Sequence, residues 1–368
     1  MIKTIKAAVA ALLLIPALLS CTKDQPVQPA HTLNCQQPAF LKAGDKVALS
    51  SPSYFTPMEN VTKTADVLRG WGFEPVIGPN VGKIEAGKYA GTVQERISDI
   101  LWAFRDPEIK AIICNRGGYG TIQLVDQISL TEFSRNPKWL VGFSDITTLH
   151  EMLSCAGVMS IQGTMSSFLA AGGTDISSTL VRDLLKGQVP RYELPAHPQN
   201  ITGSASGTLV GGNLMTFAPV VGSSADATAY DDIILFIEEV EESMHNIDRQ
   251  VNMLLKTGVL ARCKGVILGE FTDCGKELDY QSVEAMLRPY FAQFGIPVLC
   301  GFPGGHDDVN LPLVMGARVT MDVRQDGATL SFNIDGTQTP VSTGSAVTKS
   351  TPTSLQRRLF LSGKALAE

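Results

Sequence analysis

The sequence PKWLVGFSDITTLHEML, at residues 137–153, changes from one structural pattern to another at a single serine. Residues 139–141 form a short apolar run, which is typical of a buried strand. Beyond the serine, Ile146, Leu149 and Leu153 recur at three- and four-residue steps, as on one face of a helix. The stretch therefore predicts a strand followed by a sharp turn and a helix.

The turn Gly142–Asp145 places Ser144 at its apex. Such a turn exposes the hydroxyl group and leaves backbone N–H groups at the helix start available to bind an oxyanion. Alternatively, Ser144 or Asp145 merely caps the helix, a common role for both residue types. The turn also lacks the second glycine of the G-x-S-x-G elbow, so taken alone it leaves both interpretations open.

Strands and helices alternate on both sides of this turn. The predicted strands cover 46–50, 74–77, 110–114, 139–141 and 158–161, and helices are predicted at 60–71, 92–104 and 146–156. This alternation predicts an α/β fold with right-handed crossovers and a parallel sheet. Ligands bind beyond the carboxyl ends of the strands in such sheets, and both Ser144 and the glycine-rich loop 116–120 lie at such ends.

We predict an N-terminal nucleophile domain at 37–169 and a second domain at 206–336, joined by a connection at 170–205 in which the pattern weakens. The second domain shows buried strands at 232–237, 264–268 and 297–300, and a hairpin over 318–334. Residues 337–368 are predicted to be a tail with a short surface helix at 355–366.

The N-terminus has the features of a targeting segment. Lys3 and Lys6 precede an apolar stretch, residues 7–19, that is too short to predict a membrane span. It ends in Leu-Leu-Ser-Cys, which resembles a bacterial lipobox. We therefore expect a signal peptide at 1–20, a lipid on Cys21, a tether at 21–36 and a location on a bacterial membrane. The alternative is an ordinary signal peptide with an incidental cysteine.

Composition excludes some classes of partner. With 30 Lys and Arg against 36 Asp and Glu, the net charge is −6, which offers no electrostatic footprint for nucleic acid. The seven cysteines contain no C-x-x-C pair, so a zinc site of the usual spacing is not expected. We predict no metal and no cofactor, and the sequence assigns no disulfide.

Of the five histidines, His306 has the best position for a general base. It follows a buried strand in a loop with three glycines, where backbone can come close to a cleft. His150 lies more than a turn along the helix after Ser144, and we do not expect it to reach back over that helix start. A turn histidine in water is the alternative for His306.

Glu238 is the first polar residue after the apolar run 233–237. A carboxylate there can bind one nitrogen of an imidazole and fix its tautomer. The order Ser144, Glu238, His306 is the order found in α/β hydrolases. Glu239 is the alternative partner, and a solvated acidic loop is the alternative to any role.

The loop Arg116–Gly120 lacks the Lys-Ser/Thr pair of a phosphate loop. We interpret it as a backbone cradle for an oxyanion or a carboxylate.

Together these segments resemble the LD-carboxypeptidase family, which includes muramoyl-tetrapeptide carboxypeptidases and microcin C self-immunity peptidases. The similar segments run from about Leu41 to Ile334 and are Arg116–Gly120, Gly142–Thr147, Gly211–Leu214, Ile237–Glu239 with Ile247–Arg249, and Gly305–His306.

The resemblance implies a Rossmann-like N-terminal domain and a smaller, swivelling β/α-barrel-like C-terminal domain. It implies a triad with Ser144 as nucleophile, His306 as base and Glu238 as orienting residue. It further implies an oxyanion or substrate site at Gly117, Gly118, Asp145 and Asn213, a homodimer, and no metal.

The expected reaction is release of D-alanine from murein tetrapeptides by a serine carboxypeptidase. An amidase of the microcin-immunity type and a non-catalytic peptidoglycan-binding lipoprotein are the alternatives. The chain departs from the family in its lipobox. It also has Gln162-Gly163-Thr164 where many members have His-Gly-Pro, a segment that borders the site.

Overall fold

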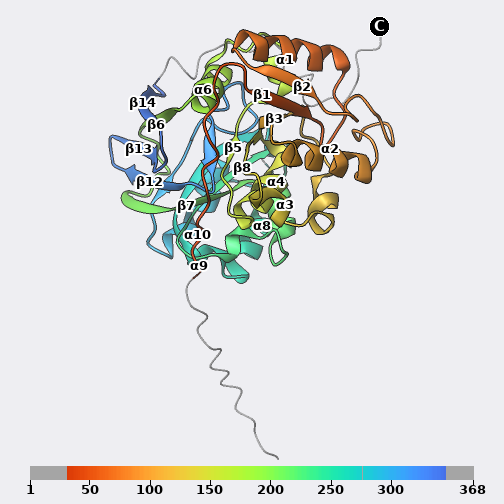
Figure 1. Cartoon of the computed structure of the whole chain (residues 1–368). Coiled ribbons are helices and arrows are strands. Elements are labelled where there is room, and N and C mark those ends of the chain that lie inside the picture. Colours follow the sequence, from red (N-terminus) through yellow and green to blue (C-terminus); the bar gives the residue numbers. More distant parts are fainter. Residues whose placement is uncertain (1–30, 276, 345–368) are drawn as a thin grey trace, which may run out of the picture. The chain divides into compact units, whose positions relative to one another are not determined.

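The nucleophile segment belongs to a six-stranded sheet in the computed structural model, which describes residues 31–275 and 277–344 (Figure 1). The strand order is β11-β5-β4-β3-β1-β2. Five strands are parallel and confirm the predicted sheet: β1 (Lys46–Ser50), β2 (Glu74–Ile77), β3 (Ile109–Cys114), β4 (Trp139–Gly142) and β5 (Ser160–Gln162). The sixth strand, β11 (Leu313–Met315), comes from the C-terminal half of the chain and pairs antiparallel with β5.

Helices cover both faces of this sheet because successive strand residues point to opposite sides. Val47 and Leu49 of β1 share a core cluster with α1 (Met58–Gly70), whereas Ala48 packs in the cluster of α2 (Val93–Arg105) and α4 (Thr147–Cys155). A capping box between Thr92 and Glu95 starts α2. The cluster on the α1 side continues into the second sheet, so both sheets share one core.

The second sheet has eight strands in the order β10-β9-β8-β7-β12-β13-β6-β14. Strands β7 to β10 are parallel to one another, and β12 and β13 form the predicted hairpin. This sheet confirms the second domain of the predicted α/β fold. Its strands are β6 (Gln188–Pro195), β7 (Gly203–Asn213), β8 (Ile233–Val240), β9 (Cys263–Thr272), β10 (Val298–Leu299), β12 (Arg318–Val323), β13 (Gly327–Phe332) and β14 (Thr337–Ser342).

The remaining helices are short or lie over the second sheet. They are α3 (Thr131–Ser134), α5 (Ser166–Leu169), α6 (Ile176–Leu185), α7 (Leu214–Phe217), α8 (Met244–Lys256), α9 (Val259–Arg262) and α10 (Val283–Ala292), with 3₁₀ turns η1 (Thr121–Gln127), η2 (Ser144–Ile146), η3 (Ala218–Val220) and η4 (Ala227–Ala229).

Three predicted boundaries differ from the structure. Residues 32–36, predicted to be tether, pack on the fold because Leu33 and Cys35 are buried and the Gln36 amide binds the Gly157 carbonyl at 2.7 Å. The predicted connection 170–205 contains α6, β6 and the start of β7. The predicted tail begins with β14, an exposed edge strand that is held by pairing with β6 rather than by an apolar face. The predicted helix at 355–366 lies outside the described residues.

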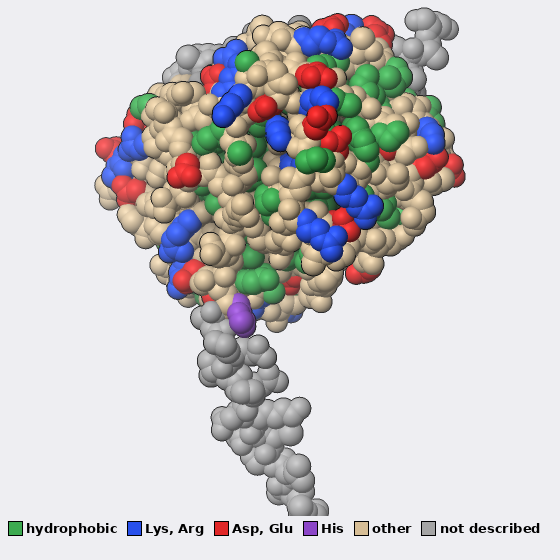
Figure 2. Space-filling model, viewed as in Figure 1, with side chains coloured by type: hydrophobic (Ala, Val, Ile, Leu, Met, Phe, Trp, Pro, Cys, Tyr) green, Lys and Arg blue, Asp and Glu red, His purple; other side chains and the backbone are tan. Residues whose placement is uncertain are grey.

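The surface agrees with the mixed composition. Basic and acidic side chains are interspersed over the face seen in Figure 2. Within residues 31–275 and 277–344, no helix is both long and apolar enough to cross a bilayer. The six cysteines in these ranges carry free thiols.

A buried carboxylate connects the first sheet's helix layer to the second sheet. Glu151 of α4 accepts hydrogen bonds from the Gly211 amide at 2.9 Å and the Ala227 amide at 3.1 Å. Nearby, the Asn213 amide donates to the Thr147 hydroxyl at 3.2 Å. Burial raises the pKa of Glu151 to about 8, although the amide bonds oppose this shift. The helix after Ser144 is therefore fixed to the end of β7.

The Glu151 pKa predicts a pH dependence of stability. A raised pKa in the folded state stabilises the fold fully below the ordinary value of 4.5, and the stabilisation is lost as pH rises through about 8. Glu151→Gln cannot ionise, so its free energy of unfolding should fall less over this window, by a few kcal/mol at most. Urea unfolding over a pH series measures this. A variant that loses stability as steeply as the wild type would contradict the prediction.

Candidate active site

Ser144 occupies a strained turn between β4 and α4. Its φ of +65° lies in the left-handed region, which a residue other than glycine adopts at a cost. The preceding Phe143 is extended, and no side-chain cap bond forms at the start of η2 or of α4. Neither Ser144 nor Asp145 therefore caps the helix. The turn has the backbone geometry of a nucleophile elbow.

The glycine-rich loop lies directly against this serine. A Cβ atom built on Gly117 would be 3.0 Å from the Ser144 Cβ and 3.3 Å from the Asp145 amide nitrogen. Gly118 has a φ of +121° and passes so close to Tyr54 that a side chain would collide with the ring. The contact brings the loop backbone alongside the Asp145 amide, and these are the groups predicted to bind an oxyanion.

The Asp145 side chain connects the loops that follow β1 and β3 to the turn. Its carboxylate accepts from the Ser53 hydroxyl at 2.6 Å and from the Thr121 amide at 3.0 Å. The Thr121 hydroxyl donates to the Asp145 carbonyl at 2.6 Å. Burial raises the pKa of Asp145, and these hydrogen bonds oppose the shift. Asp145 thus holds the turn in place through its side chain as well as its amide.

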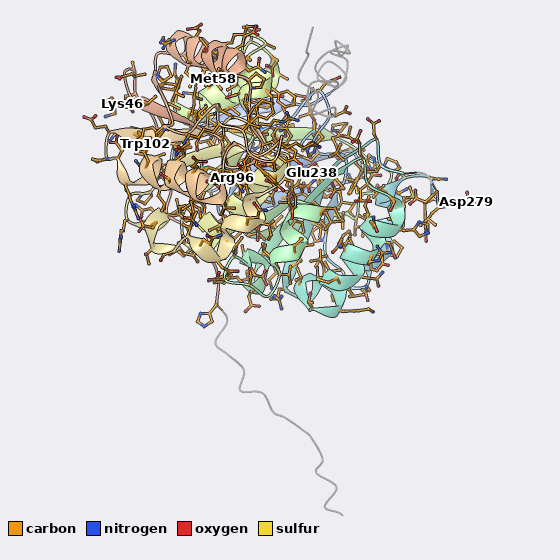
Figure 3. All side chains as sticks on the ribbon, turned by 90° about the vertical axis from the view of Figure 1, so that its right-hand side faces the viewer. Lys46, Met58, Arg96, Trp102, Glu238 and Asp279 are labelled. Atoms are coloured by element: carbon orange, nitrogen blue, oxygen red, sulfur yellow. The ribbon has the colours of Figure 1, made fainter. Side chains whose placement is uncertain are left out.

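Arg96 of α2, labelled in Figure 3, is buried and supports the same loops. Its guanidinium donates to the Pro52 carbonyl at 3.0 Å and to the Gly120 carbonyl at 2.9 Å. The sequence analysis missed Arg96, Ser53 and Thr121. The signal available was a charged residue on the apolar stripe of a predicted helix.

His306 and Glu238 form a buried pair. His306 Nδ1 lies 2.7 Å from Glu238 Oε2, and their side chains are 1% and 0% exposed. A carboxylate only accepts, so Nδ1 carries the hydrogen and Nε2 is the ring nitrogen that can take up a proton. The imidazole ring lies 5.1 Å, centroid to centroid, from the ring of Phe143, the residue before Ser144. Figure 3 places Glu238 in the interior of the molecule.

Gly305 allows this pair to form. Its φ is +142°, and a Cβ atom there would be 2.9 Å from Glu238 Oε2. The preceding Gly304 carbonyl accepts from the Glu270 amide at 3.0 Å, which fixes the loop to β9. Only glycine fits between the loop and the carboxylate.

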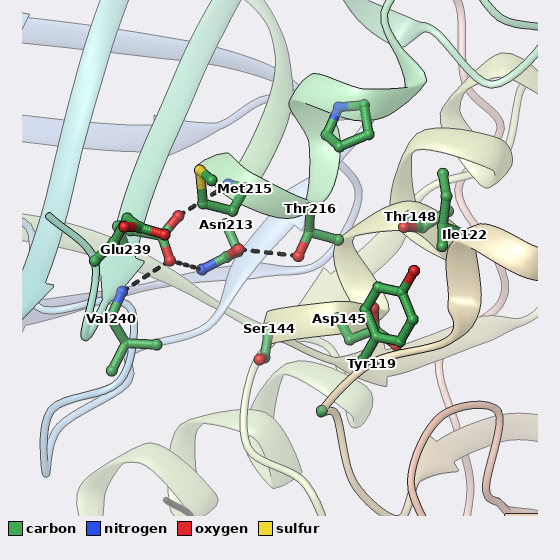
Figure 4. A pocket seen from close by; sticks show the side chains of 13 residues that line it. Tyr119, Ile122, Ser144, Asp145, Thr148, Asn213, Met215, Thr216, Glu239 and Val240 are labelled. Carbon is green, nitrogen blue, oxygen red and sulfur yellow. Dashed lines mark hydrogen bonds between the residues drawn. The ribbon is translucent and has the colours of Figure 1, made fainter. Parts of the chain in front are cut away.

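Glu239 does not bind His306, because neighbouring strand residues point to opposite faces. Its carboxylate accepts from Asn213 Nδ2 at 2.9 Å, from the Met215 amide at 2.8 Å and from the Val240 amide at 2.9 Å (Figure 4). Burial, with the nearby Glu238 carboxylate, raises the pKa of Glu239 to about 7. Asn213, predicted among the substrate-binding residues, lies beside it.

A pocket of about 360 Å³ opens between Ser144 and this group (Figure 4). Its acidic lining residues are Asp145, Glu239 and Glu242, and among the described residues no Lys, Arg or His lines it. The rest of the lining is Gly118, Tyr119, Ile122, Ser144, Thr148, Asn213, Met215, Thr216, Pro219 and Val240. The arrangement suits a ligand that carries positive charge.

His150 has a structural role instead of a catalytic one. Its Nε2 lies 2.9 Å from the Gly142 carbonyl and its Nδ1 lies 2.7 Å from the Ser160 hydroxyl. The carbonyl must accept, so Nε2 carries the hydrogen and Nδ1 accepts from Ser160. Burial lowers the pKa of His150 to about 4. The prediction that His150 does not reach back over the helix start was wrong, because its ring binds the Gly142 carbonyl before the turn. Both ring nitrogens are engaged there, so His150 supports the strand before the turn and is not placed as the serine's base.

Two other histidines, His197 and His245, take local partners. His197 Nδ1 accepts from the Gln199 amide at 3.3 Å, and the exposed His245 ring contacts Glu277 at 3.2 Å. Across residues 31–275 and 277–344, no three His, Cys, Asp or Glu side chains gather as a metal ion requires.

Two segments of the chain match models of the two domains of one peptidase family. Residues 47–163 match the LD-carboxypeptidase N-terminal domain, and residues 206–321 match the LD-carboxypeptidase C-terminal domain. The family matched is one of hydrolases that cleave peptide bonds. The chain belongs to the LD-carboxypeptidase family, because these models together match more than half of it.

Several relatives span most of the chain. A carboxypeptidase homologue from Synechocystis sp. is 34% identical and covers 81% of this chain and 98% of its own. The murein tetrapeptide carboxypeptidase of Pseudomonas aeruginosa is 29% identical over 72% of this chain and 89% of its own. The microcin C7 self-immunity protein MccF of Escherichia coli is 26% identical over 77% of this chain and 92% of its own.

Solved structures have the same fold. The crystal structure of a muramoyltetrapeptide carboxypeptidase from Oxalobacter formigenes is 26% identical, covers 79% of this chain and all of its own, and aligns with a TM-score of 0.71. A structure of MccF in complex with glutamyl sulfamoyl guanosine is 22% identical, covers 80% of this chain and 98% of its own, and gives the same TM-score.

Substitution of each adjacent glutamate tests which of the two orients His306. Ser144→Ala and His306→Ala should each reduce peptidase turnover by about 10⁴-fold or more, and the double variant should be little worse, because such groups act as a unit. Glu238→Gln should lose far more kcat than Glu239→Gln, because Glu238 binds the imidazole. Steady-state kinetics measures this. A larger kcat loss in Glu239→Gln would contradict the assignment.

Proposed function

We propose that this protein is a serine carboxypeptidase that hydrolyses an L,D-amide bond and releases terminal D-alanine from murein tetrapeptides. The observation that carries the proposal is the buried His306–Glu238 pair, packed against the residue before a serine in a left-handed turn. The membership of the chain in the LD-carboxypeptidase family supports the same reaction class.

The proposed reaction passes through an acyl-enzyme. Ser144 Oγ attacks the carbonyl carbon while its proton moves to His306 Nε2. The resulting oxyanion accepts hydrogen bonds from the Asp145 amide and the Gly117–Gly118 backbone. The C–N bond then breaks as the imidazolium protonates the leaving amine, and water, activated by the same imidazole, releases the acyl group. Glu238 keeps Nδ1 protonated and stabilises the imidazolium.

The acidic residues of the pocket support a substrate with an ammonium group on its side chain. Besides a carboxylate, diaminopimelate, the residue that precedes D-alanine in many murein tetrapeptides, carries a free ammonium group at the far end of its side chain. Such a group would be attracted to Glu239 and Glu242 while its acyl carbon faces Ser144. Ammonium binding favours the ionised form of Glu239, so substrate affinity should rise as pH passes about 7.

The alternative function, that of a microcin-immunity amidase, fits this pocket less well. Relatives of this type include MccF, which is known in complex with glutamyl sulfamoyl guanosine and aspartyl sulfamoyl adenosine. The acidic side chains of those ligands would lie near Glu239 and Glu242 without the ammonium group that diaminopimelate offers. A non-catalytic peptidoglycan-binding protein is the other alternative, and a serine-reactive fluorophosphonate would not label it.

The substrate proposal is tested by assaying D-alanine release from murein tetrapeptide. Glu242→Gln should lower kcat/KM for the diaminopimelate peptide several-fold and Glu242→Lys by about tenfold or more, because the attraction becomes repulsion. Glu241→Lys is the matched control, since Glu241 is exposed and does not line the pocket. Equal effects of the two lysine variants, or preference of the wild type for glutamyl sulfamoyl adenosine, would refute the substrate class.

We further propose that Cys21 carries lipid and anchors the protein to a bacterial membrane. A diacylglyceryl group with an N-acyl chain buries enough methylene to hold firmly, at ~0.8 kcal/mol each. Cys21→Ser should therefore move the protein from the detergent phase to the aqueous phase in Triton X-114 partitioning, with activity on soluble peptide unchanged. Continued partitioning into detergent would exclude lipid at Cys21 as the anchor.

The homodimer is proposed on the family resemblance alone. Sedimentation velocity of the soluble Cys21→Ser protein would distinguish a dimer from a monomer.

A further inference from the structure

Gln162 lies between the two halves of the candidate triad. As the last residue of β5, its backbone pairs with Gly142 of β4 on one side and with Leu313 of β11 on the other. Gly142 precedes Ser144 by two residues, and β11 follows the His306 loop along the chain. Gln162 thus pairs both with the strand that precedes Ser144 and with the strand that follows His306.

The Gln162 side chain reaches the histidine loop itself. Its Nε2 donates to Asn310 Oδ1 at 2.9 Å, and the same oxygen accepts from the Gly305 amide at 3.1 Å. A backbone N–H can only donate, so the atom facing Gly305 must be the oxygen of Asn310. This in turn requires Gln162 to present its NH₂ group. The chain of contacts runs from Gln162 through Asn310 to the residue immediately before His306.

Two further contacts hold the end of the loop that follows His306. The Leu311 amide binds the Pro303 carbonyl at 2.8 Å and closes the base of the loop. The Asn310 amide donates to the Ser177 hydroxyl at 2.9 Å. Gln162 and Asn310 are each 1% exposed, so water does not compete for the bond between their side chains.

Burial of the side-chain amides of Gln162 and Asn310 lowers stability. Gln162 Oε1 and Asn310 Nδ2 are buried and have no hydrogen-bond partner among the described residues. Burying unpaired polar atoms is unfavourable, and two apolar side chains of similar shape would avoid the penalty. Departures from good packing of this kind are expected where function requires them.

We propose that Gln162 is a positioning residue that sets the place of His306 relative to Ser144 through Asn310 and Gly305. The inference rests on the proposed function, because it assigns His306 the role of base. Gln162 contacts no substrate in this scheme. Its loss lets the His306 loop shift against the serine, which slows proton transfer and leaves substrate binding unchanged.

The test uses Gln162→Met, which keeps the length of the side chain and removes the donor. We expect kcat for D-alanine release to fall about 10- to 100-fold, with KM changed less than about twofold, because a misplacement of about 1 Å has this effect on reacting groups. The rate of Ser144 labelling by a fluorophosphonate should fall in parallel. Gln162→His, whose ring N–H can still donate, should retain more of kcat than Gln162→Met.

Two further variants separate positioning from general damage to the core. Thr164→Val is the matched control, because the Thr164 hydroxyl is also buried and has no hydrogen-bond partner in the described part of the chain, two residues along the same segment. It should keep wild-type kcat. Asn310→Ala should reproduce the kcat loss, and the double variant Gln162→Met/Asn310→Ala should be no worse than the more damaging single, as coupled residues require.

The outcomes distinguish this inference from the proposed function. If Gln162→Met keeps the wild-type kcat and labelling rate, the inference is overturned. The proposed function is still supported in that case if the wild type releases D-alanine. A wild-type protein that neither reacts with the probe nor releases D-alanine would refute the function itself. If Gln162→Met does not fold, wild-type kcat in Asn310→Ala overturns the inference equally.

Discussion

The hydrogen bond between Glu238 and His306 imposes the strictest requirement on this structure. Both side chains are almost wholly buried, and a buried carboxylate without a partner is strongly destabilising. To satisfy it, β8 must turn Glu238 toward the histidine loop, the loop after β10 must approach without a side chain at Gly305, and Phe143 must lie against the imidazole. The second sheet thus carries the acid and base, and the first carries the serine.

Much of this arrangement could be predicted from the sequence, because its signals are local. Continuous apolar runs identified the parallel strands of the first sheet, and the change of pattern at Gly142 identified the serine turn. The choice between Glu238 and Glu239 could not be made locally. It depends on which face of β8 meets the histidine loop, and both residues follow the same apolar run.

The supporting contacts could not be predicted, for a different reason. Asp145 and Ser53 are 92 residues apart, and Gln162 and Asn310 are 148 apart. Periodicity indicates that a polar side chain sits on a buried face but says nothing about its partner. Short strands such as β11, with three residues, and polar edge strands such as β14 likewise carry too little pattern to be recognised. These elements complete both sheets and fix the candidate site.

The pairing of β11 with β5 has a consequence for the order in which the protein becomes a catalyst. During synthesis from the N-terminus, β5 keeps an unpaired edge until residue 315 is available, because the strand that covers it comes from the far half of the chain. His306 lies in the same part of the chain, shortly before this strand. The serine turn can therefore form early, but the proposed base arrives only with the strand that closes the first sheet. A nascent or truncated chain that ends before this segment contains Ser144 but lacks the proposed base, His306.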